Sequence, residues 1–463
     1  MKNIAYLIAA LVLTGCANTP AYKRPAVNLP AQWQAETRLI KSSTMPSGPW
    51  WYVFADPALD DLMQAALGDN LDLEAALARI DQARAVSRIN VAGALPSVFG
   101  NVGVTRSKKI SDAAAGNQYA AQLGIGFEPD LWGKYAALGR SGEATVTASV
   151  ETSNATALAL TGGVASAYFQ TAVLQHRISM QKDGIDAARK IDKIIEARYR
   201  HGALSGLDRA QSKANLANIE AGLPLLEQAR QQTLHELALL LGRNPENVPV
   251  VHPDLIDRAV PQTIPEALPS ELLLRRPDIR QAEASLKAAH ADIAVARANL
   301  FPSLLLTAQG GAASTQLAEL LGSPAAVFGI GLNLLAPLFQ GGRLEAGVAL
   351  NQARYRELLA NYRIVILGAL RDVENALAAF EAAQTQETFQ RTRSIEAERA
   401  FTLSRIRYEA GQVDTLTLLI SLRVWLDAKD AVLQVRLSSL NALVSLHLAV
   451  GGDLMASRPA LTK

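Results

Sequence analysis

The sequence predicts a mostly helical α+β protein made of two similar halves, each with the order helix, strand, strand, helix, helix. Three observations lead to this fold class. Hydrophobic residues make up 49% of the 463 residues but aromatic residues only 5%, which is typical of long helices packed closely together. Several short motifs recur in the same order in both halves. The spacing of apolar residues changes from a helical to an alternating period at the same place in each half.

The first residues carry a targeting signal. Lys2 precedes an apolar stretch of about ten residues, Ile4 to Leu13, which is too short to span a bilayer as a helix. The stretch ends in Leu13-Thr14-Gly15-Cys16, which resembles the lipobox of bacterial lipoproteins. This resemblance implies removal of residues 1–15, a covalent lipid on Cys16 and, because Ala17 follows, transfer to the outer membrane. The alternative is an ordinary signal peptide with a chance cysteine.

The cysteine content and the hydropathy limit how the mature chain can meet a membrane. Cys16 is the only cysteine, so no internal disulfide framework is possible. Several acyl chains on one cysteine anchor a protein firmly, whereas a single chain binds only marginally. Beyond the signal there is no uninterrupted apolar run of about 18 residues, so we expect no transmembrane helix. A chain without such a helix can cross a membrane only as strands of a closed barrel.

The chain is an internal duplication. The same difference in residue number relates Leu71 to Pro277 and Leu95-Pro96-Ser97 to Phe301-Pro302-Ser303. A slightly larger difference in residue number relates Arg198-Tyr199 to Arg407-Tyr408. A stretch rich in proline separates the halves. The predicted divisions are a signal peptide (1–15), a lipid-anchored N-terminal segment (16–56), the first repeat (57–242), a Pro-rich linker (243–270), the second repeat (271–452) and a C-terminal tail (453–463).

Each half begins with a helix followed by two strands. The first helices are expected at about 57–92 and 277–300. Apolar residues then alternate with small or polar ones from Tyr119 to Phe127 and from Phe328 to Leu334, which predicts strand pairs within about 97–131 and 303–339. One apolar and one polar face suit the wall of a transmembrane barrel. The alternative is a hairpin packed on a soluble core.

Two long helices follow each strand pair, at about 136–200 and 203–241 in the first half and about 345–410 and 413–450 in the second. Their apolar residues recur at alternating spacings of three and four, as in coiled coils. A helix of about 60 residues is roughly 90 Å long. Such helices need partners, so a self-assembled tube is favoured over a monomer. Pro224 should kink or end its helix.

Several segments together carry a family resemblance that covers nearly the whole mature chain. The chain resembles the outer-membrane factor family of TolC-like export channels, and more narrowly the NodT-type lipoproteins of RND efflux systems. The segments that carry this resemblance are Trp50 to Pro57, Leu223 to Glu227, Leu240 to Gly242, Leu273 to Glu283 and Ala296 to Ser303.

The resemblance implies a homotrimer in the bacterial outer membrane. Four strands per subunit would form a 12-stranded barrel, continued by a long α-helical barrel in the periplasm, with an equatorial region from the N-terminal segment, the linker and the C-terminus. The chain would be a passive duct for substrates received from an inner-membrane RND transporter through a periplasmic adaptor, a membrane fusion protein. The resemblance implies no cofactor besides the lipid on Cys16.

The resemblance also assigns roles to the two turns that join the long helices. The closed aperture would form near Leu416 and Ile420, with Asp414 and Asp208 adding negative charge. Related channels often have an acid where this chain has Ile420, so its constriction would be a dry, apolar gate. The alternative for both aspartates is helix capping, since each lies at a helix start. Adaptor contact is expected at Gly202, Ala203, Leu204, Gly411, Gln412 and Val413.

Other functional classes find little support in the sequence. A net charge of +2, from 45 basic and 43 acidic residues, predicts no nucleic-acid partner. The six histidines are scattered, and no metal, nucleophile or phosphate-loop motif is present, so we expect neither an enzyme nor a metal site. Two alternatives remain, a non-conducting periplasmic scaffold or adaptor lipoprotein and the duct of a type I secretion system. Lipid-exposed strand faces would favour a channel, and strand faces packed on a core would favour the scaffold.

Overall fold

The computed structural model describes residues 21–33, 40–42, 48–108, 115–246, 260–261, 263–265 and 269–452. The signal peptide, Cys16, most of the Pro-rich linker and the tail after residue 452 lie outside the described residues. The chain divides into two compact units. Unit 1 comprises Met1–Val27, Leu77–Glu151 and Arg280–Ile364, and unit 2 comprises Asn28–Ala76, Thr152–Ile279 and Val365–Lys463.

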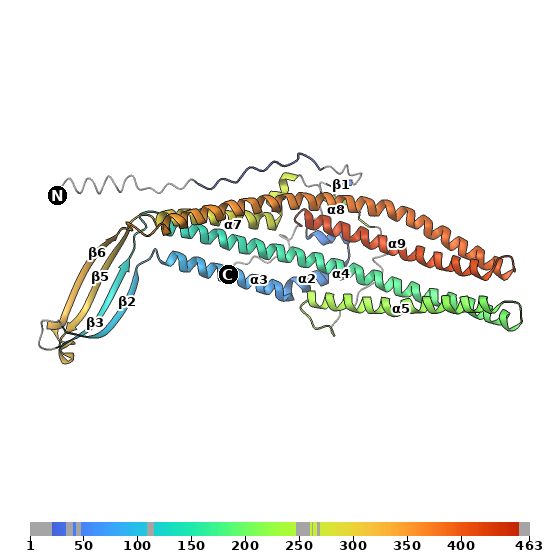
Figure 1. Cartoon of the computed structure of the whole chain (residues 1–463), viewed down its shortest axis with the longest axis horizontal. Helices are drawn as coiled ribbons and strands as arrows, with labels where there is room; N and C mark the ends of the chain where they lie inside the picture. Colours follow the sequence, from blue (N-terminus) through green and yellow to red (C-terminus); the bar gives the residue numbers. More distant parts are fainter. Residues whose placement is uncertain are drawn as a thin grey trace. The chain divides into compact units, whose positions relative to one another are not determined.

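Both halves have the predicted order of elements, which confirms the duplicated, mostly helical α+β fold (Figure 1). The first half contains α2 (Pro57–Asp69), α3 (Leu71–Ala92), β2 (Ser97–Ser107), β3 (Gly116–Phe127), α4 (Lys134–Arg200) and α5 (Gly206–Leu240). The second half contains α7 (Pro277–Ala298), β5 (Ser303–Ser314), β6 (Ala326–Leu335), α8 (Arg343–Glu409) and α9 (Thr415–Ala449). Shorter elements are β1 (Ile40–Ser42), η1 (Trp50–Phe54), β4 (Thr263–Pro265), η3 (Pro269–Glu271), α6 (Leu272–Arg275), η4 (Leu317–Glu319) and η5 (Ser323–Ala325).

Two local predictions differ from the structure. The expected single helix from Pro57 to Ala92 is interrupted at Asn70, whose side chain accepts a hydrogen bond from the Leu73 amide at 3.0 Å and donates one to the Leu240 carbonyl at 2.9 Å. A side chain that caps a new helix in this way also ends the preceding one. Helix α5 continues through Pro224, so that proline does not end the helix.

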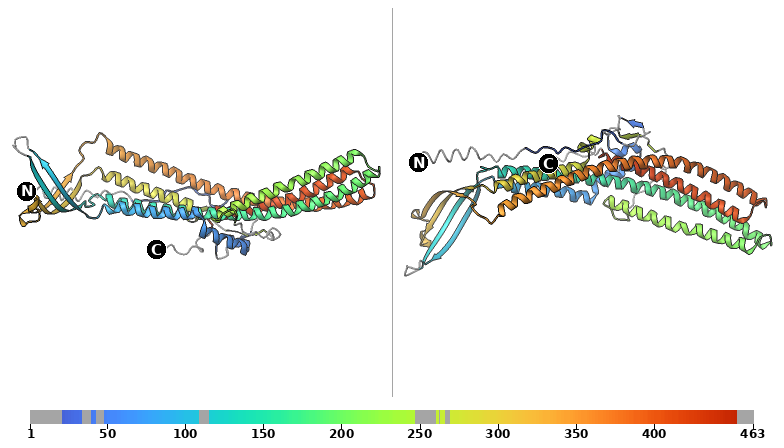
Figure 2. Two further views of the ribbon diagram at one scale, coloured as in Figure 1. Left: turned by 90° about the horizontal axis from the view of Figure 1, so that it is seen from below. Right: turned by 45° about the horizontal axis from the view of Figure 1, so that its top comes forward.

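The four strands β2, β3, β5 and β6 form one antiparallel sheet in unit 1, in that order. Strands β3 and β5 come from different halves and pair from Tyr119 with Ser314 to Phe127 with Leu306. Figures 1 and 2 show the two hairpins side by side. The sheet therefore joins the two halves through its centre, and β2 and β6 are its outer strands. In unit 2, the short strands β1 and β4 pair in parallel.

Helices α4 and α8 each have 67 residues, and α5 and α9 each have 35. At 1.5 Å per residue, the longer helices are about 100 Å long. Although no uninterrupted apolar run exists, windows in α4 and α9 are long and apolar enough to cross a membrane by composition alone. The α4 window is 78% buried within the protein, as in a core helix, and the α9 window is 50% buried.

The core of unit 2 is built around the aromatic residues of η1. Trp50 and Trp51 are almost fully buried, and Phe54 packs edge to face on Phe169 of α4, with ring centres 4.8 Å apart. The Trp50 indole N–H donates a hydrogen bond to the Thr161 hydroxyl at 3.2 Å. Among apolar residues, large aromatic side chains contribute the most to the stability of a fold when they are buried. The Trp-Trp segment that carried part of the family resemblance thus fills the centre of this unit.

An ion pair fixes the N-terminal segment in unit 1. The Arg24 guanidinium donates to both carboxylate oxygens of Glu283 on α7, at 3.0 and 2.7 Å. Burial alone would raise the pKa of Glu283, but hydrogen bonds from Arg24 and Lys287 outweigh it and hold that pKa below its usual value. Such two-pronged, charge-assisted pairs fix geometry as well as add stability. Tyr22 meets His290 of α7 edge to face, with ring centres 5.9 Å apart.

Candidate functional site

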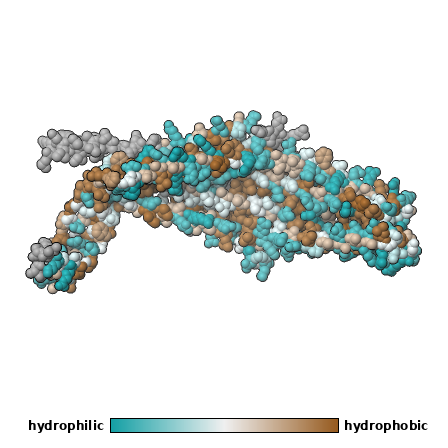
Figure 3. Space-filling view, in the orientation of Figure 1, coloured by the Kyte–Doolittle hydropathy of each residue, from teal (hydrophilic) through white to brown (hydrophobic). Residues whose placement is uncertain are grey.

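The apolar side chains of the outer strands are exposed rather than packed on a core. Val102 of β2 is 82% exposed, and Phe328 and Ile330 of β6 are 78% and 77% exposed. Leu123 and Ile125, on the strand predicted to carry an apolar face, are 67% and 45% exposed. Figure 3 shows apolar side chains over the strand hairpins. Isolated exposed apolar residues are normal, but a whole apolar sheet face marks an interaction surface.

The outer strands β2 and β6 also leave main-chain groups free. Within the described chain, each of these strands pairs with one neighbour only. A long, apolar edge strand is a template for pairing with another strand, and closed barrels remove such edges altogether. The exposed faces and open edges are therefore the features of a sheet that is incomplete as a single chain.

The two turns that join the long helices have the same backbone structure. Gly202 and Gly411 both adopt left-handed φ values, 75° and 72°, that favour glycine. The next residue in each turn donates its amide back to the helix, Ala203 to the Arg198 carbonyl at 2.9 Å and Gln412 to the Arg407 carbonyl at 2.8 Å. These bonds satisfy carbonyl groups that a helix end would otherwise leave free. The sequence duplication is thus repeated in the geometry of the turns.

The two aspartates of the tips cap helices. Asp208 and Ser205 form a reciprocal capping box at the start of α5, in which the Asp208 amide donates to the Ser205 hydroxyl at 3.2 Å. Asp414 accepts from the Thr417 amide at 2.8 Å at the start of α9. The Ser205 hydroxyl lowers the pKa of Asp208, and Thr417 lowers that of Asp414. The capping interpretation therefore describes their contacts, whereas their part in a gate remains a prediction.

Leu416 and Ile420 lie on one exposed stripe of α9. Each is 48% exposed, and Val424, one turn further, is 41% exposed. The intervening Leu418 and Leu422 are buried among the helices of unit 2. Spacings of four residues place side chains above one another on a helix. The structure thus brings the two predicted constriction residues together on a single apolar face of α9 that is about half exposed within the described chain.

Arg198 is a tip residue whose role the sequence did not indicate. Its guanidinium donates to the carbonyl oxygens of Tyr408 and Glu409, at 3.2 and 3.0 Å, and lies 4.9 Å from the centre of the Tyr408 ring. These contacts connect the α4–α5 turn to the α8–α9 turn, which lie next to each other in Figure 2. The repeated Arg-Tyr pair was visible as a motif, but the spatial link between its two copies was not.

The predicted adaptor contacts lie at the surface of the tips. Gly202, Ala203, Gly411 and Gln412 are exposed, whereas Leu204 and Val413 are half-buried. Leu204 and Val413 pack against the apolar cluster between the helices. At the tips, Gly202, Ala203 and Gly411 therefore present main-chain groups and a single methyl group to the solvent, and Gln412 presents an amide side chain. Among the described residues, no group of three or more His, Cys, Asp or Glu side chains is placed to hold a metal ion.

Comparison with known proteins gives the decisive observation. The family model for outer membrane efflux proteins matches residues 62–243 and 268–452. The chain belongs to the outer membrane efflux protein family. This efflux protein is 36% identical to the pyoverdine export outer membrane protein OpmQ of Pseudomonas aeruginosa, over 100% of this chain and 99% of that protein. It is 30% identical to the solvent efflux pump outer membrane protein SrpC of Pseudomonas putida, over 98% of each.

Solved structures show the same architecture. The outer-membrane channel OprN has a TM-score of 0.87 and 26% identity, covering 94% of this chain and 99% of that one. The open-state MtrE outer-membrane channel of Neisseria gonorrhoeae has a TM-score of 0.83 and 28% identity, covering 94% and 97%. The efflux protein is therefore an outer-membrane channel that extends into the periplasm, as the sequence resemblance predicted. Its family is one of transport channels.

Proposed function

We propose that three copies of this efflux protein assemble into one duct. The β2 edge of each copy would pair with the β6 edge of the next, so that three four-stranded sheets close into a 12-stranded barrel. The observation that carries this proposal is the combination of two open edges with an apolar face that nothing in the described chain covers. A lipid bilayer would cover the apolar face, and two neighbouring copies would pair with the two open edges.

The helix tips would form the closed, periplasmic end of this duct. Three copies of the exposed Leu416–Ile420 stripe would surround the axis and exclude water while they remain close together. The turns at Gly202–Leu204 and Gly411–Val413 would bind a periplasmic adaptor, which connects the duct to an inner-membrane RND transporter. The exposed glycines Gly202 and Gly411 would let another protein approach the main chain of these turns closely.

The N-terminal segment would tether each subunit to the outer membrane through lipid on Cys16. The Arg24–Glu283 ion pair fixes the chain eight residues after Cys16. It would therefore hold the lipid anchor close to α7. Mass spectrometry of the mature N-terminus tests the lipid directly. Cys16→Ser is expected to abolish lipidation while the barrel still inserts. Complete loss of outer-membrane location would show that the anchor does more than this proposal assigns to it.

Assembly and conduction can be tested on the purified full-length protein. Unheated samples should migrate in denaturing gels as an oligomer that heat converts to monomer, because a closed barrel resists the detergent. Planar-bilayer recording should detect discrete conductance steps once the tips open. A species that migrates as a monomer without heating, together with the absence of any conductance, would contradict the trimeric duct and favour a non-conducting scaffold.

A further inference from the structure

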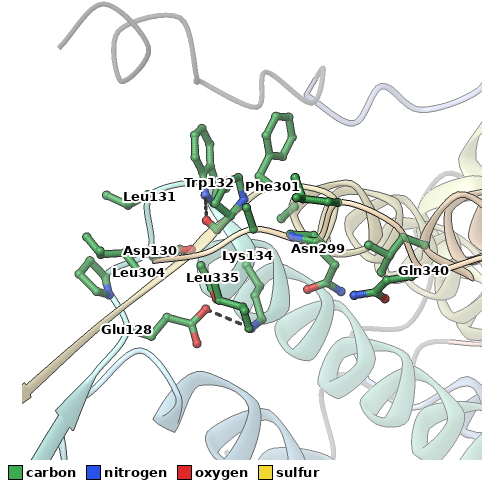
Figure 4. Close-up of a pocket in the computed structure, with 18 of the residues that line it drawn as sticks. Glu128, Asp130, Leu131, Trp132, Lys134, Asn299, Phe301, Leu304, Leu335 and Gln340 are labelled. Carbon is green, nitrogen blue, oxygen red and sulfur yellow. Dashed lines mark hydrogen bonds and ion pairs between the residues drawn. The ribbon is translucent and has the colours of Figure 1, made fainter. Parts of the chain in front are cut away.

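A pocket of about 820 Å³ lies at one end of the four-stranded sheet, within unit 1 (Figure 4). Ser303 pairs with Leu335 and Phe127 with Leu306, so the end of β3, the start of β5 and the end of β6 meet at the same edge. Helices α4 and α8 begin there and α7 ends there. In an outer-membrane channel this edge is the boundary between the strands in the bilayer and the helices in the periplasm.

An aromatic pair forms one wall of the pocket. The rings of Trp132 and Phe301 are stacked, with centres 4.8 Å apart and an angle of 21° between planes. The Trp132 indole N–H donates to the Pro302 carbonyl at 2.6 Å, which fixes the ring in place. Figure 4 shows both rings extending in the same direction. Aromatic side chains with an apolar body and a polar tip are typical of the headgroup level of membranes.

The segment between β6 and α8 forms an exposed apolar rim. Leu338 is 95% exposed and Phe339 90% exposed, and Leu335 at the end of β6 is 69% exposed. These side chains follow directly in the chain on the exposed apolar row of β6, which consists of Phe328, Ile330, Leu332 and Leu334. Three large apolar side chains of this kind are costly in water. In an outer-membrane channel, exposed side chains at the end of a membrane strand are of the kind that the hydrocarbon of the bilayer would cover.

The charged residues of the pocket are balanced. Glu128 pairs with Lys134 at 3.3 Å and also accepts from the Tyr135 hydroxyl at 3.0 Å. Asp130 is exposed and accepts from two main-chain amides at the start of α4. Arg343 is exposed at the start of α8, and its side-chain hydrogen bond within the described chain goes to the neutral amide of Gln340. A guanidinium with only a neutral partner is free to bind an anion.

We propose that this pocket binds the headgroup of a glycerophospholipid from the periplasmic leaflet of the outer membrane. The phosphate would lie at Arg343, where the main-chain amides at the start of α8 also favour negative charge. The ammonium group of a zwitterionic headgroup would lie near the exposed carboxylate of Asp130. The acyl chains would cover Leu338 and Phe339. Because Glu128 and Lys134 neutralise each other, Asp130 and Arg343 are left as one acid and one base, which suit a zwitterionic headgroup better than an anionic one.

Native mass spectrometry of the full-length assembly measures the retained lipid. The delipidated protein is titrated with phosphatidylethanolamine, phosphatidylglycerol or inorganic phosphate. We expect about one lipid per subunit, tighter binding of phosphatidylethanolamine and no competition by phosphate. Arg343→Gln should weaken this binding about tenfold, as expected for loss of a charge-assisted hydrogen bond. The matched control is Arg354→Gln, on an exposed position of the same helix outside the pocket, which should leave binding unchanged.

A second measurement tests the location. Phosphatidylethanolamine brominated on its acyl chains should quench part of the tryptophan fluorescence in nanodiscs, and Trp132→Phe, which keeps the aromatic stacking, should remove that part. Equal lipid binding by the Arg343→Gln and Arg354→Gln variants would overturn the proposal. So would quenching that persists in Trp132→Phe. A structure of the assembly with Leu338 and Phe339 buried against a neighbouring copy would assign the pocket to subunit contact instead.

Discussion

Arg198 on α4 lies against Tyr408 at the end of α8, with its guanidinium 3.2 Å from the Tyr408 carbonyl oxygen and 4.9 Å from the centre of the Tyr408 ring. Tyr408 is itself buried, with its hydroxyl 3.5 Å from that of Thr415 at the start of α9. The first tip is therefore joined to the second through a main-chain acceptor that a mutation at position 408 cannot remove. This makes Arg198 the informative residue to change.

Arg198→Ala should favour the open state of the tips. Hydrogen bonds from a charged donor contribute about 1.5–3 kcal/mol each, so loss of the link should raise the open probability by about tenfold or more. Single-channel recording measures this directly. Arg200→Ala is the matched control, because Arg200 is largely exposed and pairs with Glu196 on its own helix. Equal open probabilities in the two variants would show that the Arg198 link does not hold the tips closed.

Ile420→Asp should wet the constriction. Three carboxylates in place of three apolar side chains would attract cations and remove the barrier that a dry ring presents. We expect higher cation conductance and selectivity, by roughly an order of magnitude in conductance, in planar bilayers. Ile420→Val keeps the ring apolar and should retain the closed state. If the aspartate variant matches the wild-type protein in selectivity and open probability, Ile420 does not belong to the gate.

Two substitutions of Asp414 separate capping from gating. Asparagine retains an oxygen that accepts from the Thr417 amide but removes the charge, whereas alanine removes both. If Asp414 only caps α9, the asparagine variant should conduct like the wild-type protein, and only the alanine variant should lose stability at the tip. A change in cation selectivity in the asparagine variant would show instead that the charge acts on permeating ions. Limited proteolysis at the α8–α9 turn measures the local stability.

His447 should make the stability of unit 2 depend on pH. It stacks on Trp50, with ring centres 5.7 Å apart, and within the described chain neither ring nitrogen has a hydrogen-bond partner. Burial lowers the pKa of His447 from 6.5 to about 4. In the unfolded chain, His447 therefore binds a proton below about pH 6.5. In the folded chain, it binds that proton only below about pH 4. The free energy of unfolding should therefore fall as the pH drops from about 6.5 to about 4, by about 3 kcal/mol in total, and above this window His447 should add no pH dependence.

His447→Leu should remove this component of the pH dependence while keeping an apolar side chain in the core. Denaturant unfolding of the purified protein between pH 4 and pH 7.5 measures the effect. The matched control is His235→Gln, which replaces an exposed histidine of α5 and leaves His447 and Trp50 in place. An identical slope in the wild-type and His447→Leu proteins would show that folding does not lower the pKa of His447.

Much of this architecture follows from local signals. The shared offset between Leu95-Pro96-Ser97 and Phe301-Pro302-Ser303 revealed the duplication, and alternation from Tyr119 to Phe127 located a strand. Both signals depend on neighbours along the chain, where periodicity maps directly onto a helix or strand face. The break at Asn70 was not predicted, because that residue's side chain is held by the Leu240 carbonyl, 170 residues away in the chain.

The sequence by itself determined the order of elements, the duplication and, through family resemblance, the channel class. Only the tertiary structure decided that the outer strands leave apolar faces such as Phe328–Leu334 uncovered within the described chain. It also decided that Arg198 meets Tyr408 and that Arg24 meets Glu283. Periodicity specifies which residues share a face, but not what covers that face. Side chains distant in sequence meet only once helices pack, so no local pattern records those contacts.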